Sequence, residues 1–432
     1  MNFYNLKHKE EQLNFKEATI KGQGKDKGLF FPEDISKFSP EFLKNLPNLS
    51  DEEIAYQVMK DFAGDEIPEA ELRKIVAETI AFEIPLKKVT ENISVLELFH
   101  GPTLAFKDVG ARFMSRCLGY FLKNETRKVT VLVATSGDTG GAVANGFYNV
   151  EGIEVVILYP KNRVSPVQEK QLTALGKNIH ALEVNGSFDD CQALVKQAFS
   201  DESLNEKLLL TSANSINVAR WLPQQIYYVL ALKQWLKTHS ENPVICVPSG
   251  NFGNICAGIL AHHRGLPVEH FIAACNVNDV VPEYLRTEIL QPKETVATIS
   301  NAMDVGDPSN FVRILELFDK EFNQVKSKLS GYTIDDEETL KTIKRVEKDY
   351  GYVLDPHGAV AFVALEKYLV EKGGKGFFLE TAHPVKFPDS VEKATGKSVE
   401  IPKSLEELMK QEKFTTEINP QYEELKGFLL GK

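Results

Sequence analysis

Hydrophobic positions in the middle of the chain fall in short continuous runs rather than at helical spacing. VTVLVA (129–134), IEVVILYP (153–160) and HFIAACN (270–276) are apolar and rich in β-branched residues. Such runs are typical of strands buried on both faces of a parallel sheet. The stretch PVICVPSGNFGNICAGILAHHRG (243–265) has the pattern of a strand, a glycine loop and a helix. This alternation predicts an α/β fold with parallel sheets covered by helices.

The N-terminal residues follow a different, amphipathic pattern. Ser50 and Glu53 have the spacing of a capping box, apolar residues follow at helical spacing, and Gly64 ends the segment. A second amphipathic helix is expected after Pro68. These patterns predict a mainly helical accessory domain.

The C-terminal third adds two helices and a strand. Acidic residues begin a helix expected over 335–351, Asp355 and Pro356 have the N-cap and first-turn positions of the next helix, and 376–384 is a buried strand. The expected domains are the helical N-terminal domain 1–92, a large α/β domain made of 93–128 and 205–400, a small α/β domain 129–204, and a surface tail 401–432 of helix and loop.

Composition narrows the class of protein. The 432 residues, 43% hydrophobic and 26% charged, are typical of a globular chain of about three domains. Apolar runs such as ICAGILA are far shorter than the ~18 residues that span a membrane. The N-terminus has no apolar signal segment, and the five cysteines form no CxxC pair. We therefore expect a cytoplasmic protein with reduced thiols and no membrane partner.

Charge and missing motifs exclude several functions. The formal net charge of −11 argues against a nucleic-acid partner, which requires clustered lysine and arginine. His262 and His263 are adjacent and point to different helix faces, and there is no HExxH or Cys/His cluster, so no metal site is expected. The lack of a GxSxG motif removes support for a hydrolase.

Two glycine loops are candidate anion sites. SGNFGN (249–254) and TSGDTGG (135–141) each lie between a strand and a helix, where backbone N–H groups converge on one point. Neither fits GxGxxG or a P-loop. An unliganded tight turn is the alternative for each loop alone. A parallel sheet binds ligands at the carboxyl ends of its strands, and both loops lie at such ends, where two anionic groups would bind.

Two basic residues complete the candidate chemistry. Lys107, in HGPTLAFKDVGARFM (100–114), follows Leu104, Ala105 and Phe106, and apolar neighbours lower the pKa of an amine and favour its reaction with carbonyl groups. Arg220, in SANSINVARWLPQQIYY (212–228), is suited to bidentate binding of a phosphate or carboxylate. A lysine paired with a neighbouring acid and a surface arginine beside a helix cap are the ordinary alternatives.

Together these segments resemble the threonine synthase family of pyridoxal 5′-phosphate (PLP) enzymes of fold type II. HGPTLAFKD is similar to its lysine segment, ATSGDTGGAVA to the loop facing the cofactor ring and substrate carboxylate, VPSGNFGN to the phosphate cup, and TAHPVKFP to the motif near the pyridine nitrogen. NSINVARWLPQ, DPHGAVA and the opening FKEATIKGQGKDKGLFFPEDI also match. The resemblance covers nearly the whole chain. It implies two parallel-sheet α/β units of the tryptophan-synthase-β-like kind.

The resemblance also implies an activity and its residues. The expected reaction converts O-phospho-L-homoserine and water to L-threonine and phosphate, with Lys107 holding PLP and moving protons at Cα and Cβ. The implied cofactor-binding residues are Lys107, Phe106, Asp138 near the 3′-oxygen, Ser249, Gly250, Asn251, Phe252, Gly253, Asn254, and Thr381 at the pyridine nitrogen. The implied substrate-binding residues are Ser136, Gly137 and Thr139 near the carboxylate, Lys161, Asn217 and Arg220 at the phosphate, and Thr103.

Three alternatives remain open from the sequence. A phospho-lyase or a dehydratase on the same scaffold would give 2-oxobutyrate, and the phospho-lyase would share every cofactor motif. A binding or regulatory protein without turnover is a further alternative, although an intact Lys107 argues against it. The sequence leaves open whether the chain is a monomer or a homodimer.

Overall fold

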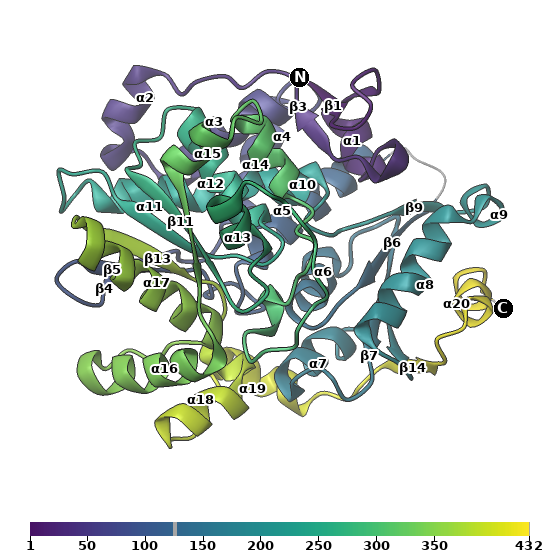
Figure 1. Cartoon of the computed structure of the whole chain (residues 1–432). Coiled ribbons are helices and arrows are strands. Elements are labelled where there is room, and N and C mark those ends of the chain that lie inside the picture. Colours follow the sequence, from purple (N-terminus) through teal and green to yellow (C-terminus); the bar gives the residue numbers. More distant parts are fainter. Residues whose placement is uncertain (124–127, 432) are drawn as a thin grey trace.

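The polypeptide folds into three sheets with helices packed on them (Figure 1). The structure, a computed structural model, describes residues 1–123 and 128–431. Two of the sheets are built mainly from parallel strands, and the third is a small antiparallel sheet near the N-terminus. The expected α/β class is confirmed.

The larger sheet has six strands in the order β12-β11-β10-β13-β5-β4. All its neighbours pair in parallel except β4 and β5. Side chains from one face pack with helices α16 and α17, and those from the other join a core that includes α11 and α12. The strands are β4 (Leu86–Lys88), β5 (Ile93–Glu97), β10 (Val244–Pro248), β11 (His270–Cys275), β12 (Leu329–Thr333) and β13 (Gly376–Glu380). The helices are α11 (Gln225–Trp235), α12 (Gly253–His263), α16 (Asp336–Tyr350) and α17 (Pro356–Lys372).

The second sheet has five parallel strands in the order β14-β8-β7-β6-β9. Helices α6 and α7 share the core on one face, and α8 and α20 cover the other. Its strands are β6 (Val129–Ala134), β7 (Ile153–Pro160), β8 (Ile179–Val184), β9 (Leu209–Thr211) and β14 (Thr415–Ile418). These helices are α6 (Asp138–Phe147), α7 (Pro166–Thr173), α8 (Phe188–Ser200) and α20 (Tyr422–Leu429).

The N-terminal region is less helical than its sequence pattern predicts. It contains the antiparallel strands β1 (Asn2–Asn5), β2 (Gln12–Asn14) and β3 (Phe30–Pro32) as well as four helices. Strands of three or four residues are too short to show an alternating pattern. The four helices are α1 (Phe15–Lys21), α2 (Pro40–Asn45), α3 (Asp51–Ala63), which Ser50 caps as expected, and α4 (Glu69–Thr79).

Two strands cross the expected domain boundaries. The segment 401–432, expected as a surface tail, supplies β14, which pairs with β8 at the edge of the five-stranded sheet. Residues 209–211, placed with the large unit, form β9 beside β6. Three of the four residues of β14 are exposed, so backbone hydrogen bonds rather than apolar burial hold it. A strand of that kind leaves no apolar run in the sequence.

The remaining helices connect these layers. Helix α5 packs against α4, α6 and α10, between the N-terminal region and the sheets. The α-helices are α5 (Lys107–Phe121), α9 (Glu202–Asn205), α10 (Val218–Trp221), α13 (Val280–Thr287), α14 (Phe311–Leu317), α15 (Phe322–Lys328), α18 (Pro388–Thr395) and α19 (Lys403–Lys410). The 3-10 helices are η1 (Lys25–Lys27), η2 (Leu46–Asn48), η3 (Leu222–Gln224), η4 (Asn301–Met303) and η5 (Pro384–Lys386). No helix within 1–123 or 128–431 is long and apolar enough to cross a membrane.

Arg264 joins the N-terminal region to the end of α12. Its buried guanidinium donates hydrogen bonds to the carbonyl oxygens of Ser36 (3.1 Å) and Val58 (2.7 Å) and pairs with Asp61. Replacing Arg264 with Met would leave these acceptors without a donor, and we expect the free energy of unfolding to fall by about 2–4 kcal/mol. Urea denaturation measures the change.

The exposed Arg286, 3.8 Å from Asp279, provides the matched control for Arg264. Arg286→Met should change stability by less than about 0.5 kcal/mol. Equal losses in the two variants would show that Arg264 does not join the two parts.

Candidate functional site

The segments of interest meet where strands of both parallel sheets end. Lys107 is the first residue of α5, and the turn before it lies along the end of β13. The Phe106 N–H donates to the Thr381 carbonyl (2.9 Å), and the His383 N–H donates to the Leu104 carbonyl (3.0 Å). The lysine segment and the TAHP segment are therefore held side by side, as the sequence predicts.

The amine of Lys107 is half-buried and free of ion pairs with the described residues. It lies 4.5 Å from the centre of the Phe106 ring. Burial lowers the pKa of Lys107 to about 8; Asp138 opposes this shift, and the positive charges of Lys386 and Arg220 add to it. At pH 7 about a tenth of this amine is therefore uncharged and nucleophilic, far more than for an ordinary lysine.

The loop 249–254 forms a cup of backbone N–H groups at the start of α12. Phe252 adopts a left-handed conformation (φ 60°), and its ring packs against Phe311. A Cβ at Gly250 would lie 2.6 Å from the Cα of Met303, so this position has no room for a side chain. The Asn251 amide donates to the Ser215 hydroxyl and accepts from the Ser309 N–H, both at 2.7 Å. The cup is thus fixed to both neighbouring loops.

Asn254, in this loop, carries a buried side-chain donor without a partner among the described residues. The hydroxyls of Tyr227 and Tyr228 donate to its Oδ1 at 2.7 and 2.6 Å, which sets the orientation of the amide. Its Nδ2 is buried and has no partner among the described residues. Ser249, by contrast, donates its hydroxyl to the Val247 carbonyl (2.9 Å) and contributes mainly backbone. A buried donor without an acceptor indicates a place for an anion or polar ligand.

The loop 135–141 provides a second group of N–H donors at the start of α6. The Thr135 hydroxyl accepts from the amides of Gly137 (3.0 Å) and Gly140 (2.9 Å) and shapes the turn. The first amides of α6, at Asp138 and Thr139, have no intrahelical acceptors. Ser136 and Thr139 are partly exposed. This loop can therefore bind a carboxylate by backbone and hydroxyl donors.

Asp138 is paired with a lysine that the sequence analysis missed. The fully buried Lys386 ammonium lies 2.7 Å from the Asp138 carboxylate and donates to the Thr103 carbonyl (2.8 Å). Gln168 donates to the same carboxylate oxygen (2.9 Å). Burial alone would raise the pKa of Asp138, but the charges of Lys386 and Lys107 outweigh it and hold the pKa well below its usual value. The apolar neighbours of Lys386 in PVKFP were the available sequence signal.

Thr103 has a structural role, because both of its hydrogen-bond donors bind Asp108. Its hydroxyl donates to one carboxylate oxygen of Asp108 (2.6 Å), and its N–H donates to the other (2.9 Å). Burial raises the pKa of Asp108, while these hydrogen bonds oppose the shift. Thr103 thus fixes the turn before Lys107, and Asp108 is not the ion-pair partner of that lysine.

The three predicted phosphate ligands differ in availability. Arg220 is 3% exposed, and its Nε is buried without a partner in the described part of the chain. Burial lowers its pKa to about 10, which still leaves it charged at neutral pH. The Asn217 amide caps α10 and donates to the carbonyls of Thr19 and Ser212. Lys161 pairs with Glu417 of β14 (2.8 Å). Arg220 is therefore the ligand with an unused donor.

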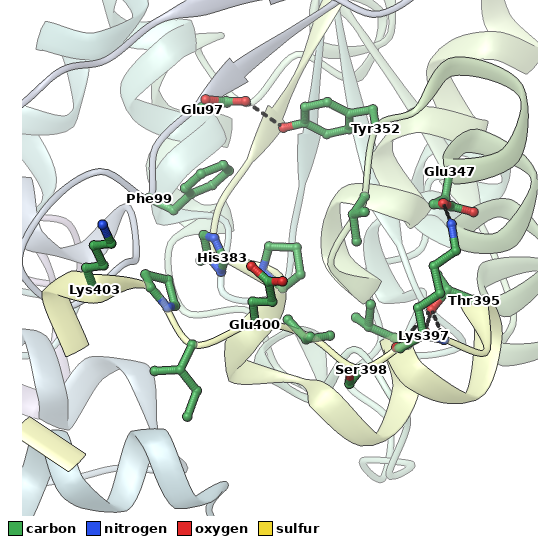
Figure 2. A pocket seen from close by; sticks show the side chains of 16 residues that line it. Glu97, Phe99, Glu347, Tyr352, His383, Thr395, Lys397, Ser398, Glu400 and Lys403 are labelled. Carbon is green, nitrogen blue, oxygen red and sulfur yellow. Dashed lines mark hydrogen bonds and ion pairs between the residues drawn. The ribbon is translucent and has the colours of Figure 1, made fainter. Parts of the chain in front are cut away.

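A separate pocket of about 510 Å³ adjoins the TAHP segment (Figure 2). Figure 2 shows Phe99 and His383 within it and the Tyr352 hydroxyl directed to Glu97 (3.1 Å). Burial, together with the nearby His100, lowers the pKa of His383 to about 4. The predicted site residues do not line this pocket.

Comparisons with known proteins decide the family. The sequence profile of the pyridoxal-phosphate dependent enzyme family matches residues 80–376, and profiles for the threonine synthase N terminus and C-terminal region match 2–80 and 358–429. The threonine synthase of Serratia marcescens is 45% identical over 434 residues, covering 100% of this chain and 99% of that protein. The chain belongs to the threonine synthase family.

Solved structures of this family share the fold. The crystal structure of threonine synthase from Escherichia coli superposes with a TM-score of 0.93 at 45% identity and covers 100% of both chains. A PLP-bound threonine synthase from Brucella melitensis gives a TM-score of 0.93 at 35% identity, over 99% of this chain and 98% of that one. The resemblance and the fold-type-II architecture are confirmed.

The residues present fit pyridoxal 5′-phosphate, the cofactor of this family. An unpaired lysine of lowered pKa suits its aldehyde, and the N–H cup with the unsatisfied Asn254 amide suits its phosphate. The region within 1–123 and 128–431 contains no cluster of three metal-ligating side chains. A PLP enzyme of the threonine synthase family needs both a site for the cofactor phosphate and a reactive lysine, and the N–H cup and Lys107 fit these two needs.

Gly250→Ala tests the cup directly. Its Cβ would displace the 302–303 backbone and spread the N–H donors, so we expect PLP affinity to fall at least about tenfold. Fluorescence titration of the cofactor-free chain with PLP measures this. Gly119→Ala, in the last turn of α5, approaches only the Val150 side chain and should retain the affinity. Unchanged affinity in Gly250→Ala would contradict the assignment of the cup.

The pKa of Lys107 predicts the pH dependence of cofactor attachment. Only the neutral amine attacks, so the rate of covalent PLP incorporation should rise about tenfold per pH unit below the pKa and level off above pH 8. Stopped-flow absorbance from pH 6 to 10 measures the profile, and Lys107→Ala provides the blank. A rate that still rises steeply between pH 9 and 10 would indicate an ordinary lysine.

Proposed function

We propose that this chain converts O-phospho-L-homoserine and water to L-threonine and phosphate with PLP as cofactor. The observation that carries the proposal is one unpaired lysine placed with two groups of N–H donors and a buried arginine. That arrangement offers separate places for a cofactor phosphate, a substrate carboxylate and a substrate phosphate. The family membership supports the same reaction.

Groups from both parallel sheets would hold the cofactor. On the six-stranded side, the amides of 250–254 and the Asn254 side chain would bind its phosphate, and the Thr381 hydroxyl would be a neutral partner for its pyridine nitrogen. On the five-stranded side, Asp138 would be the residue for its 3′-oxygen. Transfer of PLP from Lys107 to the amino group of the substrate would give the bonds at Cα an electron sink and would leave the Lys107 amine free.

Lys107 performs the proton transfers. Its neutral amine removes the proton from Cα of the substrate and then one proton from Cβ. The bond between Cγ and the phosphate oxygen breaks, and phosphate leaves with the bonding electrons. Cγ gains a proton to become the methyl group, a water molecule gives up a proton as it forms the new C–O bond at Cβ, and Cα regains its proton to give threonine.

The loop before α6 and the segment that carries Arg220 orient the substrate. The first amides of α6, with Ser136 and Thr139, bind the carboxylate. Arg220 binds the phosphate through the donors that no described residue uses. Asn217, whose amide is occupied by the backbone, positions the loop that carries Arg220.

Product analysis separates this reaction from its nearest alternative. The PLP-loaded chain supplied with O-phosphohomoserine should release phosphate and threonine in equal amounts, measured by phosphate assay and mass spectrometry. A phospho-lyase would release 2-oxobutyrate and ammonia instead of threonine. Phosphate without threonine would therefore contradict the proposed function.

Arg220→Ala tests the phosphate ligand. Loss of a hydrogen-bonded charge contact should raise KM for O-phosphohomoserine by roughly 10–100-fold, with PLP affinity little changed. Arg345→Ala, which removes a partly exposed ion pair with Glu366, is the control. An unaltered KM in Arg220→Ala would place the substrate phosphate elsewhere.

A further inference from the structure

Lys386 is a buried cation, and it has no role so far in binding the cofactor or the substrate. It lies in η5, directly after the end of β13, and is fully buried. A buried ammonium is costly unless its charge is matched and its protons are hydrogen-bonded. Both conditions are met at the site, because Asp138 is 2.7 Å away and the Thr103 carbonyl 2.8 Å away.

We propose that Lys386 is a positioning residue that occupies the carboxylate of Asp138 and so keeps the amine of Lys107 free of an ion pair. The proposal rests on the proposed function only for the role of Lys107 as the reacting lysine. It deepens that function by explaining why an acid whose charge acts on this amine does not convert it to a paired ammonium.

The geometry connects three segments through one ammonium. Asp138 begins α6 on the five-stranded side, Thr103 lies in the turn before α5, and Lys386 follows the six-stranded sheet. Gln168 and Gln171 reinforce the two acceptors, donating to Asp138 (2.9 Å) and to the Thr103 carbonyl (3.0 Å). The carboxylate is thereby held in one orientation by two donors.

The balance of charge around Lys107 depends on this pair. Asp138 and Asp355 act to raise the pKa of Lys107, and Lys386 and Arg220 act to lower it. Asp355, the N-cap of α17, is itself engaged by His357 at 2.6 Å. Without Lys386, Lys107 would lose a repulsive neighbour and face an unneutralised carboxylate. Both changes favour its charged form.

Variants that remove one charge should shift the pKa of Lys107 in opposite directions, which packing defects alone would not do. In the full chain without cofactor, Lys386→Met should raise the pKa of Lys107 by about one unit or more, and Asp138→Asn should lower it by a similar amount. The double variant D138N/K386M removes both charges and should return the value to within about half a unit of the parent.

The readout is the charge state of Lys107 itself. Trace acetylation with acetic anhydride at a series of pH values, quantified on the Lys107 peptide by mass spectrometry, follows the neutral amine without any need for turnover. Lys386→Arg retains the charge and should keep the parent profile. Lys426→Met, which breaks the pair with Asp201 beside α20, is the matched control and should not shift the profile.

The outcomes separate this proposal from the function. Opposite shifts in the single variants with cancellation in the double variant support it. Shifts of the same sign, or no shift in any variant, would falsify it, whatever product the enzyme makes. If Lys386→Met does not fold, Asp138→Asn and the double variant still decide, because the proposal requires the second substitution to reverse the shift of the first. Failure to form threonine would contradict the proposed function alone.

Discussion

The site depends on two helices whose N-cap residues carry no capping side chain. Gly137 precedes α6 and Phe252 precedes α12, and neither offers a side-chain acceptor to the first amides; the Thr135 hydroxyl accepts only from the Gly140 amide in the first turn of α6 and from that of Gly137. Other helices of the chain do carry such a cap, for example Ser50 at α3, Ser187 at α8 and Asp335 at α16. An absent cap costs about 1 kcal/mol, and a bound anion at the same position recovers it. The donors that would have stabilised the fold are left for ligands.

This local arrangement resolves a conflict with the overall charge. The formal net charge of −11 opposes the approach of phosphorylated cofactor and substrate. N–H groups and the buried guanidinium of Arg220 act at hydrogen-bond distance, where a few donors outweigh the screened charge of distant surface acids. The acidity of the chain therefore says little about its small-molecule ligands.

The sequence predicted those parts of the fold whose signals are local. β6 and β7 have the expected bounds because strands buried on both faces leave continuous apolar runs. β14 was missed because it is an exposed edge strand, held by backbone hydrogen bonds that any side chain permits. The short strands of the N-terminal sheet were missed for a related reason, since three residues define no period.

In the site, too, features with a local sequence signal were predictable and features set by distant contacts were not. The glycine loops and Lys107 were predictable, because a strand, a flexible turn and a helix start follow one another in the sequence. The hydrogen-bond partners of each side chain were not predictable. Asn217 reads as a polar ligand, yet its amide is consumed by two carbonyls and a helix cap. Lys386 was not predicted as a site residue, yet it is fully buried and paired with Asp138. Whether a polar group is free depends on partners far away in the sequence.

The pair of Lys386 and Asp138 also ties the chemistry to the contact between the two parallel sheets. Its members follow strands of different sheets, so a separation of the sheets would break the pair and expose both charges to water. The same separation would carry the loop 135–141 away from Lys107. The buried contact between Lys386 and Asp138 is therefore needed twice. It joins the two parallel sheets, and under our proposal it keeps the Lys107 amine free of an ion pair.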